Sequence, residues 1–211
     1  DGWEGEVKKE ESTATAPAPL SAQQVIDTYI AAIGGKAKLE AVKSIKSNST
    51  MMMGGMEIKV SEKKMGNKSK ATQSVMGQES VTVFDGEKGY AIQGGQKMDL
   101  PAAATDKMKT AKMFTALSMN AADYTSVTKG TVDGKEAYIL EGKDGKSYFD
   151  VSSGLMIKST SPQGDMTITE YMTVDGIKVP KTMKISAMGQ NIDMSVIEFV
   201  LNKDVSDADF K

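Results

Sequence analysis

Turn signals recur at short, even intervals along most of the chain. Asp-Gly pairs begin at Asp85, Asp133, Asp144 and Asp175, and Gly-Gly pairs begin at Gly54 and Gly94. Aspartate and glycine tolerate the positive φ angles of two-residue hairpin turns, and a spacing of about 8–12 residues between turns is typical of an all-β fold. We therefore interpret the Asp-Gly pairs as hairpin turns of an antiparallel meander, not as metal or acid/base sites.

The segments between these turns alternate or cluster β-branched and apolar residues as strands do. The sequence predicts strands over Ser44–Met53, Met56–Met65, Lys68–Met76, Val81–Phe84, Lys97–Leu100, Tyr124–Val132, Glu136–Glu141, Lys146–Val151, Leu155–Thr160, Met166–Val174, Lys178–Ala187 and Asn191–Leu201. A change of apolar phase predicts a β-bulge near Val196–Ile197. Pro180 cannot donate a ladder hydrogen bond, so it predicts an edge position or another bulge.

Two helices interrupt this pattern. Ser21 and Gln24 form a capping box at the start of a helix over Ala22–Ile33, and Gly34-Gly35 ends it. Pro101 opens a second helix, predicted over Ala102–Leu117. Its apolar residues fall on one helical face: Ala104, Met108, Ala111, Phe114 and Leu117. A short helical turn over Lys36–Val42 follows the first helix.

These elements predict one domain over Ser21–Lys211, within a chain of 211 residues. Its fold class is mainly β with a few helices: a half-open, curved antiparallel β-barrel with helices packed on its concave face. Residues 1–20 are polar and then rich in Ala, Thr and Pro, so we expect a flexible linker or tether. Trp3 is expected to be an exposed residue of that tail.

Composition removes several function classes. The formal net charge is -2, all cations are lysine, and histidine and cysteine are absent. Without arginine the chain is a poor candidate for nucleic-acid binding, and without histidine or cysteine it lacks the usual zinc ligands and the common nucleophile–base pairs. We predict no cofactor, no metal and no catalysis. The single inward carboxylate expected is Glu170, with Lys181 on the neighbouring strand as its partner.

Three aspartates near the C-terminus could suggest a calcium site, but their spacing does not match one. Asp204, Asp207 and Asp209 lack the glycine and the distal glutamate of an EF-hand loop. Ser206 and Asp209 have the spacing of a capped helical turn, which is the reading we favour.

Sixteen methionines are the unusual feature of the composition. Methionine is unbranched and polarizable, so it fills irregular gaps and adapts to varied apolar ligands. We expect an apolar ligand-binding cavity between the sheet and its helices. The candidate lining residues are Met51, Met53, Ile58, Val60, Val83, Met108, Phe114, Met166, Ile168, Met183, Ile185 and Met194. The alternative is a core that methionine fills completely.

The order of elements resembles the lipoprotein-carrier fold of the LolA/LolB-like superfamily. The segments VIDTYIAAIGGKAKLEAVKSIKS, VFDGEKGY, YFDVSSGLMIK, VDGIKVP and VSDADFK look like a periplasmic module. That module is found alone or C-terminal to insulinase-type (M16) zinc-peptidase domains. The resemblance covers Ser21–Lys211. The chain departs from these relatives by lacking the peptidase motif His-x-x-Glu-His and the arginine that latches helices in the carriers.

The resemblance implies a non-catalytic periplasmic domain that binds a lipid acyl chain or another hydrophobic small molecule. It also implies a role in lipoprotein or envelope handling, with tethering to the outer membrane through residues 1–20 as one arrangement. The alternative function is a protein-interaction or accessory module of an M16-type peptidase with a filled core. The partner would then be a peptidase domain or an envelope lipoprotein.

Overall fold

A computed structural model describes residues 14–17 and 20–211 of the chain. Its strands are β1 (Ala14–Pro17), β2 (Ser44–Met53), β3 (Met56–Met65), β4 (Lys68–Val75), β5 (Gln78–Phe84), β6 (Gly89–Gln93), β7 (Gln96–Asp99), β8 (Tyr124–Val132), β9 (Lys135–Gly142), β10 (Gly145–Asp150), β11 (Met156–Ser161), β12 (Gly164–Val174), β13 (Ile177–Ala187) and β14 (Gln190–Leu201). The helices are α1 (Ala22–Ile33), α2 (Lys36–Glu40) and α3 (Ala102–Lys109). Short 3-10 turns are η1 (Thr115–Ser118), η2 (Ala121–Asp123) and η3 (Asp207–Phe210).

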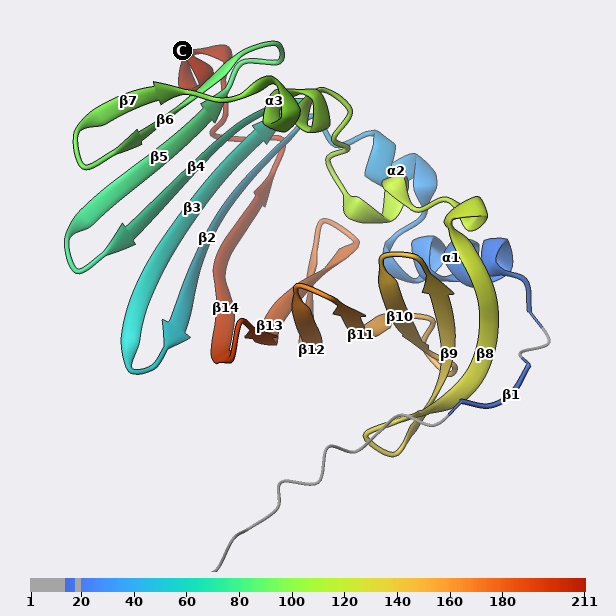
Figure 1. Cartoon of the computed structure of the whole chain (residues 1–211). Helices are drawn as coiled ribbons and strands as arrows, with labels where there is room; N and C mark the ends of the chain where they lie inside the picture. The colour runs from blue at the N-terminus through green and yellow to red at the C-terminus, as the bar shows by residue number, and fades with distance from the viewer. Residues whose placement is uncertain (1–13, 18–19) are drawn as a thin grey trace, which may run out of the picture.

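All fourteen described strands belong to one antiparallel sheet. Its order is β1-β8-β9-β10-β11-β12-β13-β14-β2-β3-β4-β5-β6-β7, so β1 and β7 are its two edges and the sheet does not close. The sheet curves around the helices α1 and α2, as Figure 1 shows. The predicted fold class, an open and curved antiparallel sheet with helices on the concave side, is confirmed.

Two meanders make up the sheet, and the connection between them crosses its concave side. One meander is β2–β7 and the other is β8–β14, and β14 joins them by pairing with β2. Strand β7 is one edge, whereas β8 lies next to the opposite edge. Residues 100–123 therefore have to span the molecule, and Figure 1 shows them passing over the concave face beside α1 and α2. We call residues 110–123 of this connection the crossover.

Helix α1 packs its apolar side into the concave face. The predicted capping box is present: Ser21 Oγ accepts from the Gln24 N–H at 3.2 Å, and Gln24 Oε1 accepts from the Ser21 N–H at 2.9 Å. Tyr29 and Ile33 of α1 are buried in the main core. That core is shared between the meanders: Val25, Ile26, Leu39, Val42, Ile45, Ala116, Leu140, Phe149, Ile177, Val179 and Leu201 complete its buried set.

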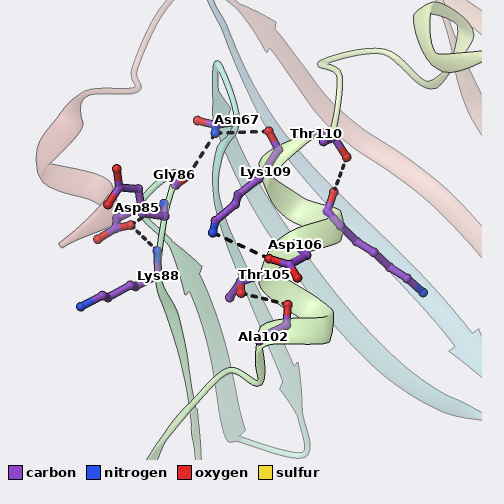
Figure 2. A network of polar contacts seen from close by, with 11 residues as sticks. Asn67, Asp85, Gly86, Lys88, Ala102, Thr105, Asp106, Lys109 and Thr110 are labelled. Atoms are coloured by element: carbon purple, nitrogen blue, oxygen red, sulfur yellow. Dashed lines mark hydrogen bonds and ion pairs between the residues drawn. The ribbon is translucent and has the colours of Figure 1, made fainter.

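The helix predicted over Ala102–Leu117 is wrong in its second half. Helix α3 ends at Lys109, because its last carbonyl groups find partners outside the helix. Thr110 Oγ1 donates to the Lys107 carbonyl oxygen at 3.2 Å, and Asn67 Nδ2 donates to the Lys109 carbonyl oxygen at 3.5 Å. Asn67 also donates to the Gly86 carbonyl oxygen at 3.2 Å, so one side chain joins two hairpins to the helix end (Figure 2).

The position of α3 is a further correction. It lies at the end of the β3–β4 and β5–β6 hairpins, where Asn67 and Gly86 are found, rather than over the centre of the sheet (Figure 1). Only Thr105 of α3 is buried. The apolar residues that continue the helical spacing, such as Phe114 and Leu117, belong to the crossover and pack against the main core.

Both predicted strand irregularities are present. The pairing of β14 with β2 shifts register between Val196 and Glu198, and Ile197 between them is 68% exposed. Pro180 lies in a part of β13 that pairs only with β12, because the pairing of β13 with β14 begins at Thr182. Proline is tolerated there since no second ladder needs its missing N–H.

The C-terminal residues form the predicted capped turn. Turn η3 begins after Ser206, whose side chain and Asp209 make the predicted capping box. Asp209 accepts from Lys63 Nζ at 2.8 Å and Asp207 from Lys68 Nζ at 2.6 Å, so the turn is fastened to β3 and β4. No cluster of three metal-ligating side chains is present in the described part of the chain.

Part of the predicted linker is paired. Residues Ala14–Pro17 form β1 beside β8. Residues 1–13 and 18–19, with Trp3 among them, lie outside the described residues. None of the helices in the described ranges is long and apolar enough to cross a membrane.

Candidate functional site

An apolar cavity of about 330 Å³ lies between the concave face of the sheet and the layer formed by α1 and the crossover. Helix α1 contributes Tyr29 and Ile33 to its wall. The crossover contributes Met113, Phe114, Thr115, Ala116 and Met119, and the sheet contributes Ile45, Ser47, Ser49, Val60, Glu62, Lys64, Met156, Met166, Ile168, Lys178, Val179, Pro180, Met183, Met194, Val196 and Phe199. Most of this wall is aliphatic or aromatic, with six methionines in it.

Six of the twelve predicted lining residues meet at this cavity: Val60, Phe114, Met166, Ile168, Met183 and Met194. Met183 and Met194 are directly opposite each other on β13 and β14, and Ile168 is opposite Met183 on β12. Because opposite residues of paired strands point to the same face, one row of three strands supplies the floor of the cavity.

Four further predicted residues share this face but lie beyond the cavity, toward the turns that end β2, β4 and β13. They are Met51, Met53, Ile58 and Ile185, placed by their pairing with Met194, Ile192 and Val75. Ile58 is buried and the other three are half-buried. They extend the apolar surface of the cavity along the sheet without enclosing it.

Val83 and Met108 do not belong to the site. Val83 is opposite Lys70, and Lys70 is opposite Lys63, so all three point to the convex face, away from the cavity. Phe84, which follows Val83 in β5, points to the same face of the sheet as the cavity residue Lys64. Met108 lies on α3 at the sheet end and does not line the cavity.

Sequence reasoning missed several lining residues. Tyr29 and Ile33 belong to the apolar side of α1, but nothing local in the sequence shows that this side borders a void. Ser47 and Ser49 continue the row of Met51 and Met53 on one face of β2, and that period of two was the available signal. Small side chains opposite bulky ones leave room, which is the physical reason for the cavity at this point.

Of two hydrogen-bonded tyrosines, Tyr29 lines the cavity and Tyr171 does not. The Tyr171 hydroxyl donates to the Met156 carbonyl oxygen at 2.7 Å, and the Tyr29 hydroxyl is hydrogen-bonded to that of Tyr171. Burial raises the pKa of both phenols above the ordinary tyrosine value, so both stay uncharged. An edge-to-face contact with Phe149, 5.2 Å between ring centroids, holds Tyr29 in place.

Charged groups are confined to one side of the cavity. Glu62 and Lys64 of β3 lie 3.9 Å apart and partly exposed, and Lys178 of β13 completes the set. This arrangement offers an ion pair and one further cation near solvent.

Glu170 is not inward-pointing, which corrects the sequence prediction. The β12–β13 register shifts on both sides of Glu170, so the alternation along β12 is interrupted and the side chain turns outward. Its carboxylate pairs with Lys181 at 3.4 Å, as predicted, with both side chains about half exposed. Neither residue lines the cavity.

The carboxylates with lowered pKa lie in turns and in ion pairs at the sheet ends. Backbone N–H groups of Lys88 and Glu87 lower the pKa of Asp85 within its hairpin turn. At Asp150 burial alone would raise the pKa, and hydrogen bonds from Ser153 and Ser152 outweigh it. Both aspartates therefore order turns and stand outside the cavity.

Comparison with known proteins finds likeness only at the level of structure. No protein-family model and no curated protein matches the sequence. A LolA superfamily protein from Nitrosomonas europaea matches with a TM-score of 0.60 and 13% identity, over 91% of this chain and 98% of that one. A putative outer membrane lipoprotein-sorting protein domain from Vibrio parahaemolyticus matches with a TM-score of 0.58 and 9% identity, over 90% and 97%.

A DUF1329 family protein from Desulfovibrio piger matches with a TM-score of 0.58 and 11% identity, over 90% of this chain and 97% of that one. These likenesses extend over nearly the whole of each chain, at identities too low to carry anything except the fold. The chain therefore has the LolA-like fold, an open curved sheet with helices on its concave face.

Proposed function

We propose that residues 21–211 form a non-catalytic domain of the bacterial periplasm that binds a hydrophobic ligand, such as a lipid acyl chain, in the cavity beneath the crossover. The observation that carries this proposal is the methionine-rich cavity of about 330 Å³. Its volume lies within the range of about 300–1,000 Å³ that small-molecule sites occupy. The LolA-like fold, and the description of the Vibrio parahaemolyticus neighbour as a putative outer membrane lipoprotein-sorting protein domain, support the location.

Affinity would come from burial and not from charge. Each CH₂ group transferred from water into the cavity gains about 0.8 kcal/mol, so a partly enclosed chain binds without a charged contact. Methionine side chains adjust to chains of different shape at small cost. The half-buried surface formed by Met51, Met53 and Ile185 extends the contact for a ligand longer than the cavity.

The first prediction tests whether the cavity is open to a ligand. Ser49 is buried on the cavity side of β2, so Ser49→Leu should fill part of the void. We expect binding of a fluorescent fatty acid to weaken by about tenfold, or about 1.4 kcal/mol. The melting temperature should stay level or rise, because the added side chain enters free space. Native mass spectrometry of gently purified protein should show a bound lipid that the variant lacks.

The matched control is Thr50→Leu, the next residue of β2, which points to the opposite face of the sheet. It should leave fatty-acid binding unchanged. If the unaltered protein binds no fatty acid and Ser49→Leu lowers stability by the roughly 1–3 kcal/mol typical of overpacking, the core is filled. The ligand-binding proposal then fails and the accessory-module function takes its place.

A further inference from the structure

Four neighbouring hairpins present uncharged tips at one end of the sheet. The hairpins β13–β14, β2–β3, β4–β5 and β6–β7 follow one another in the strand order, and their turns lie at the same end (Figure 1). The turn pairs are Met188-Gly189, Gly54-Gly55, Met76-Gly77 and Gly94-Gly95. Turns at the opposite end of the same strands are different, since Asp85-Gly86 and Asp175-Gly176 carry carboxylates there.

Exposed methionines gather on these hairpins. Met188 is 96% exposed, Met76 87%, Met98 54% and Met52 41%. We call these four side chains the methionine rim. Apart from Ile197 they are the only large apolar side chains so exposed in the described ranges.

Neither the backbone nor the core explains methionine at the two tips. Met76 and Met188 have φ angles of 50° and 52°. These angles lie in the left-handed region, where glycine, asparagine and aspartate are the favoured residues. Equivalent positions of other turns in this chain hold Gly54, Gly94 and Asp133. At such exposure neither methionine contributes to the core. Both residues therefore sit at a conformational cost, with apolar atoms held in water.

We propose that the methionine rim docks on a lipid bilayer, with its side chains entering the boundary between headgroups and acyl chains. Several tips in a row along one sheet end can reach a flat surface together. Because the four turns carry no charge, immersing the turn residues removes no ionised group from water, whereas Asp193 and Glu57, which are opposite Met52, stay at the level of the headgroups. Unbranched methionine side chains suit a fluid surface, which has no fixed shape to complement.

Charges behind the rim have both signs. Glu57 and Lys59 form an ion pair at 4.0 Å on β3, Glu79 follows the β4–β5 turn, and Lys97 follows the β6–β7 turn. A net attraction to anionic headgroups is therefore not built in. We expect binding to zwitterionic lipid, with little dependence on salt or on added anionic lipid.

An apolar path joins the rim to the cavity. Met194 in the cavity floor is opposite Met51, Ile192 is opposite Met53, and Met53 is opposite Met56 beside the Gly54-Gly55 turn. These residues share the concave face and carry no charge. A chain could pass from the bilayer to the cavity along this row. This route rests on the proposed ligand-binding function, whereas docking of the rim does not.

The test is flotation of the full chain with phosphatidylcholine vesicles. The double variant Met76→Asn, Met188→Asn should lower the bound fraction by about tenfold, or about 1.4 kcal/mol. Its melting temperature should stay level or rise, because asparagine tolerates the left-handed conformation. The matched control is Ile197→Asn, which changes an apolar residue that is 68% exposed at the β14 bulge, away from the turns, and this variant should float as the unaltered protein does.

A second measurement locates the contact. The chain has no cysteine, so Met188→Cys and Ile197→Cys can each be labelled with one environment-sensitive dye. Vesicles should shift the emission of the dye at position 188 to the blue and leave that at position 197 unchanged. Absence of flotation, equal flotation of the double variant, or equal shifts at both positions overturns the proposal.

The two proposals fail separately. Fatty-acid binding without vesicles should be the same in the rim double variant as in the unaltered protein. Normal fatty-acid binding without flotation rejects the membrane contact alone. Flotation without fatty-acid binding rejects the ligand-binding function and leaves the rim as a membrane anchor.

Discussion

Tyr171 joins three elements through one hydroxyl group. It donates to the Met156 carbonyl of β11 and is paired with Tyr29 of α1, so helix and sheet are connected at the cavity wall. Removing a buried partner costs more than the hydrogen bond contributes, because the remaining groups stay out of water. The Tyr171 hydroxyl group therefore contributes to the stability of the packing of α1 on the sheet.

Alkaline pH should reveal this pair. Burial raises the pKa of Tyr29 and Tyr171 in the folded protein above the ordinary value near 10. The folded state then holds these protons more tightly than the unfolded state. The contribution of this pair to stability should be constant below about pH 10 and fall as pH rises above it, since only the unfolded chain then gains by ionising. Melting temperatures between pH 8 and 11, with tyrosinate absorbance, measure this.

The variant Tyr171→Phe gives the corresponding test at neutral pH. It should lower the free energy of unfolding by about 1–3 kcal/mol, because the Met156 carbonyl and the Tyr29 hydroxyl lose their partner. Tyr90→Phe is the control, since the Tyr90 hydroxyl donates to the Lys211 carbonyl oxygen in an exposed setting. Equal effects of the two substitutions would contradict a special role for Tyr171.

At the scale of elements, the C-terminal turn η3 depends on two lysines of the sheet. Hydrogen bonding to Lys68 lowers the pKa of Asp207, and hydrogen bonding to Lys63 lowers that of Asp209. A carboxylate with lowered pKa stabilises the fold above its unfolded pKa, and the contribution disappears as pH falls through the folded value. The turn should therefore loosen in acid, below about pH 4.

Asp209→Asn tests this attachment. The change removes the ion pair with Lys63 and weakens the acceptor for the Ser206 N–H. We expect a decrease of at most about 1 kcal/mol in the free energy of unfolding, the range of exposed ion pairs. Hydrogen exchange should accelerate at residues 206–211 and stay unchanged in α1. If Lys63→Met in the Asp209→Asn background lowers stability as much as it does alone, the pair contributes nothing.

Local signals in the sequence were sufficient for most strands and for α1, but not for β1, which lies in residues predicted as a linker. The turns and the capping box lie within four residues of the ends that they define, so adjacent sequence contains the information. Helix α3 shows the limit: the apolar spacing continues to Leu117, yet Asn67, more than forty residues away, accommodates the helix end. No local pattern contains that contact.

At the scale of the whole molecule, the face of the sheet to which a side chain points was harder to predict than the strand to which it belongs. Val83 and Phe84 are both apolar and both buried, and only the pairing of β5 with β4 decides which one faces inward. Glu170 points outward because the pairing of β12 with β13 shifts register there, and the sequence of β12 alone does not indicate that shift. Six of the twelve predicted residues line the cavity, five of them on strands whose alternation indicated it, whereas the lining residues of the crossover depended on where that connection passes.

The crossover offers a prediction that links architecture to ligand binding. Lys112 is exposed between the end of α3 and the cavity residues Met113 and Phe114. A bound fatty acid should hold this segment in place, so trypsin should cut after Lys112 several-fold more slowly when the ligand is present. Cleavage elsewhere, for example in the unrelated turn at Lys143, should keep its rate. Protection of both sites alike would indicate general stabilisation and not a lid.

The two meanders are joined by the pairing of β14 with β2, so the sheet can be completed only after β14 has been synthesised. Strand β2 is synthesised long before β14, and Asn48 and Glu198, which are hydrogen-bonded between these two strands, are 150 residues apart in sequence. Until β14 has been synthesised, β2 therefore keeps one unpaired edge beside its methionines. Contacts of such long separation slow folding and leave strands open to wrong partners. A nascent chain of this kind needs its edge shielded until the final strand arrives.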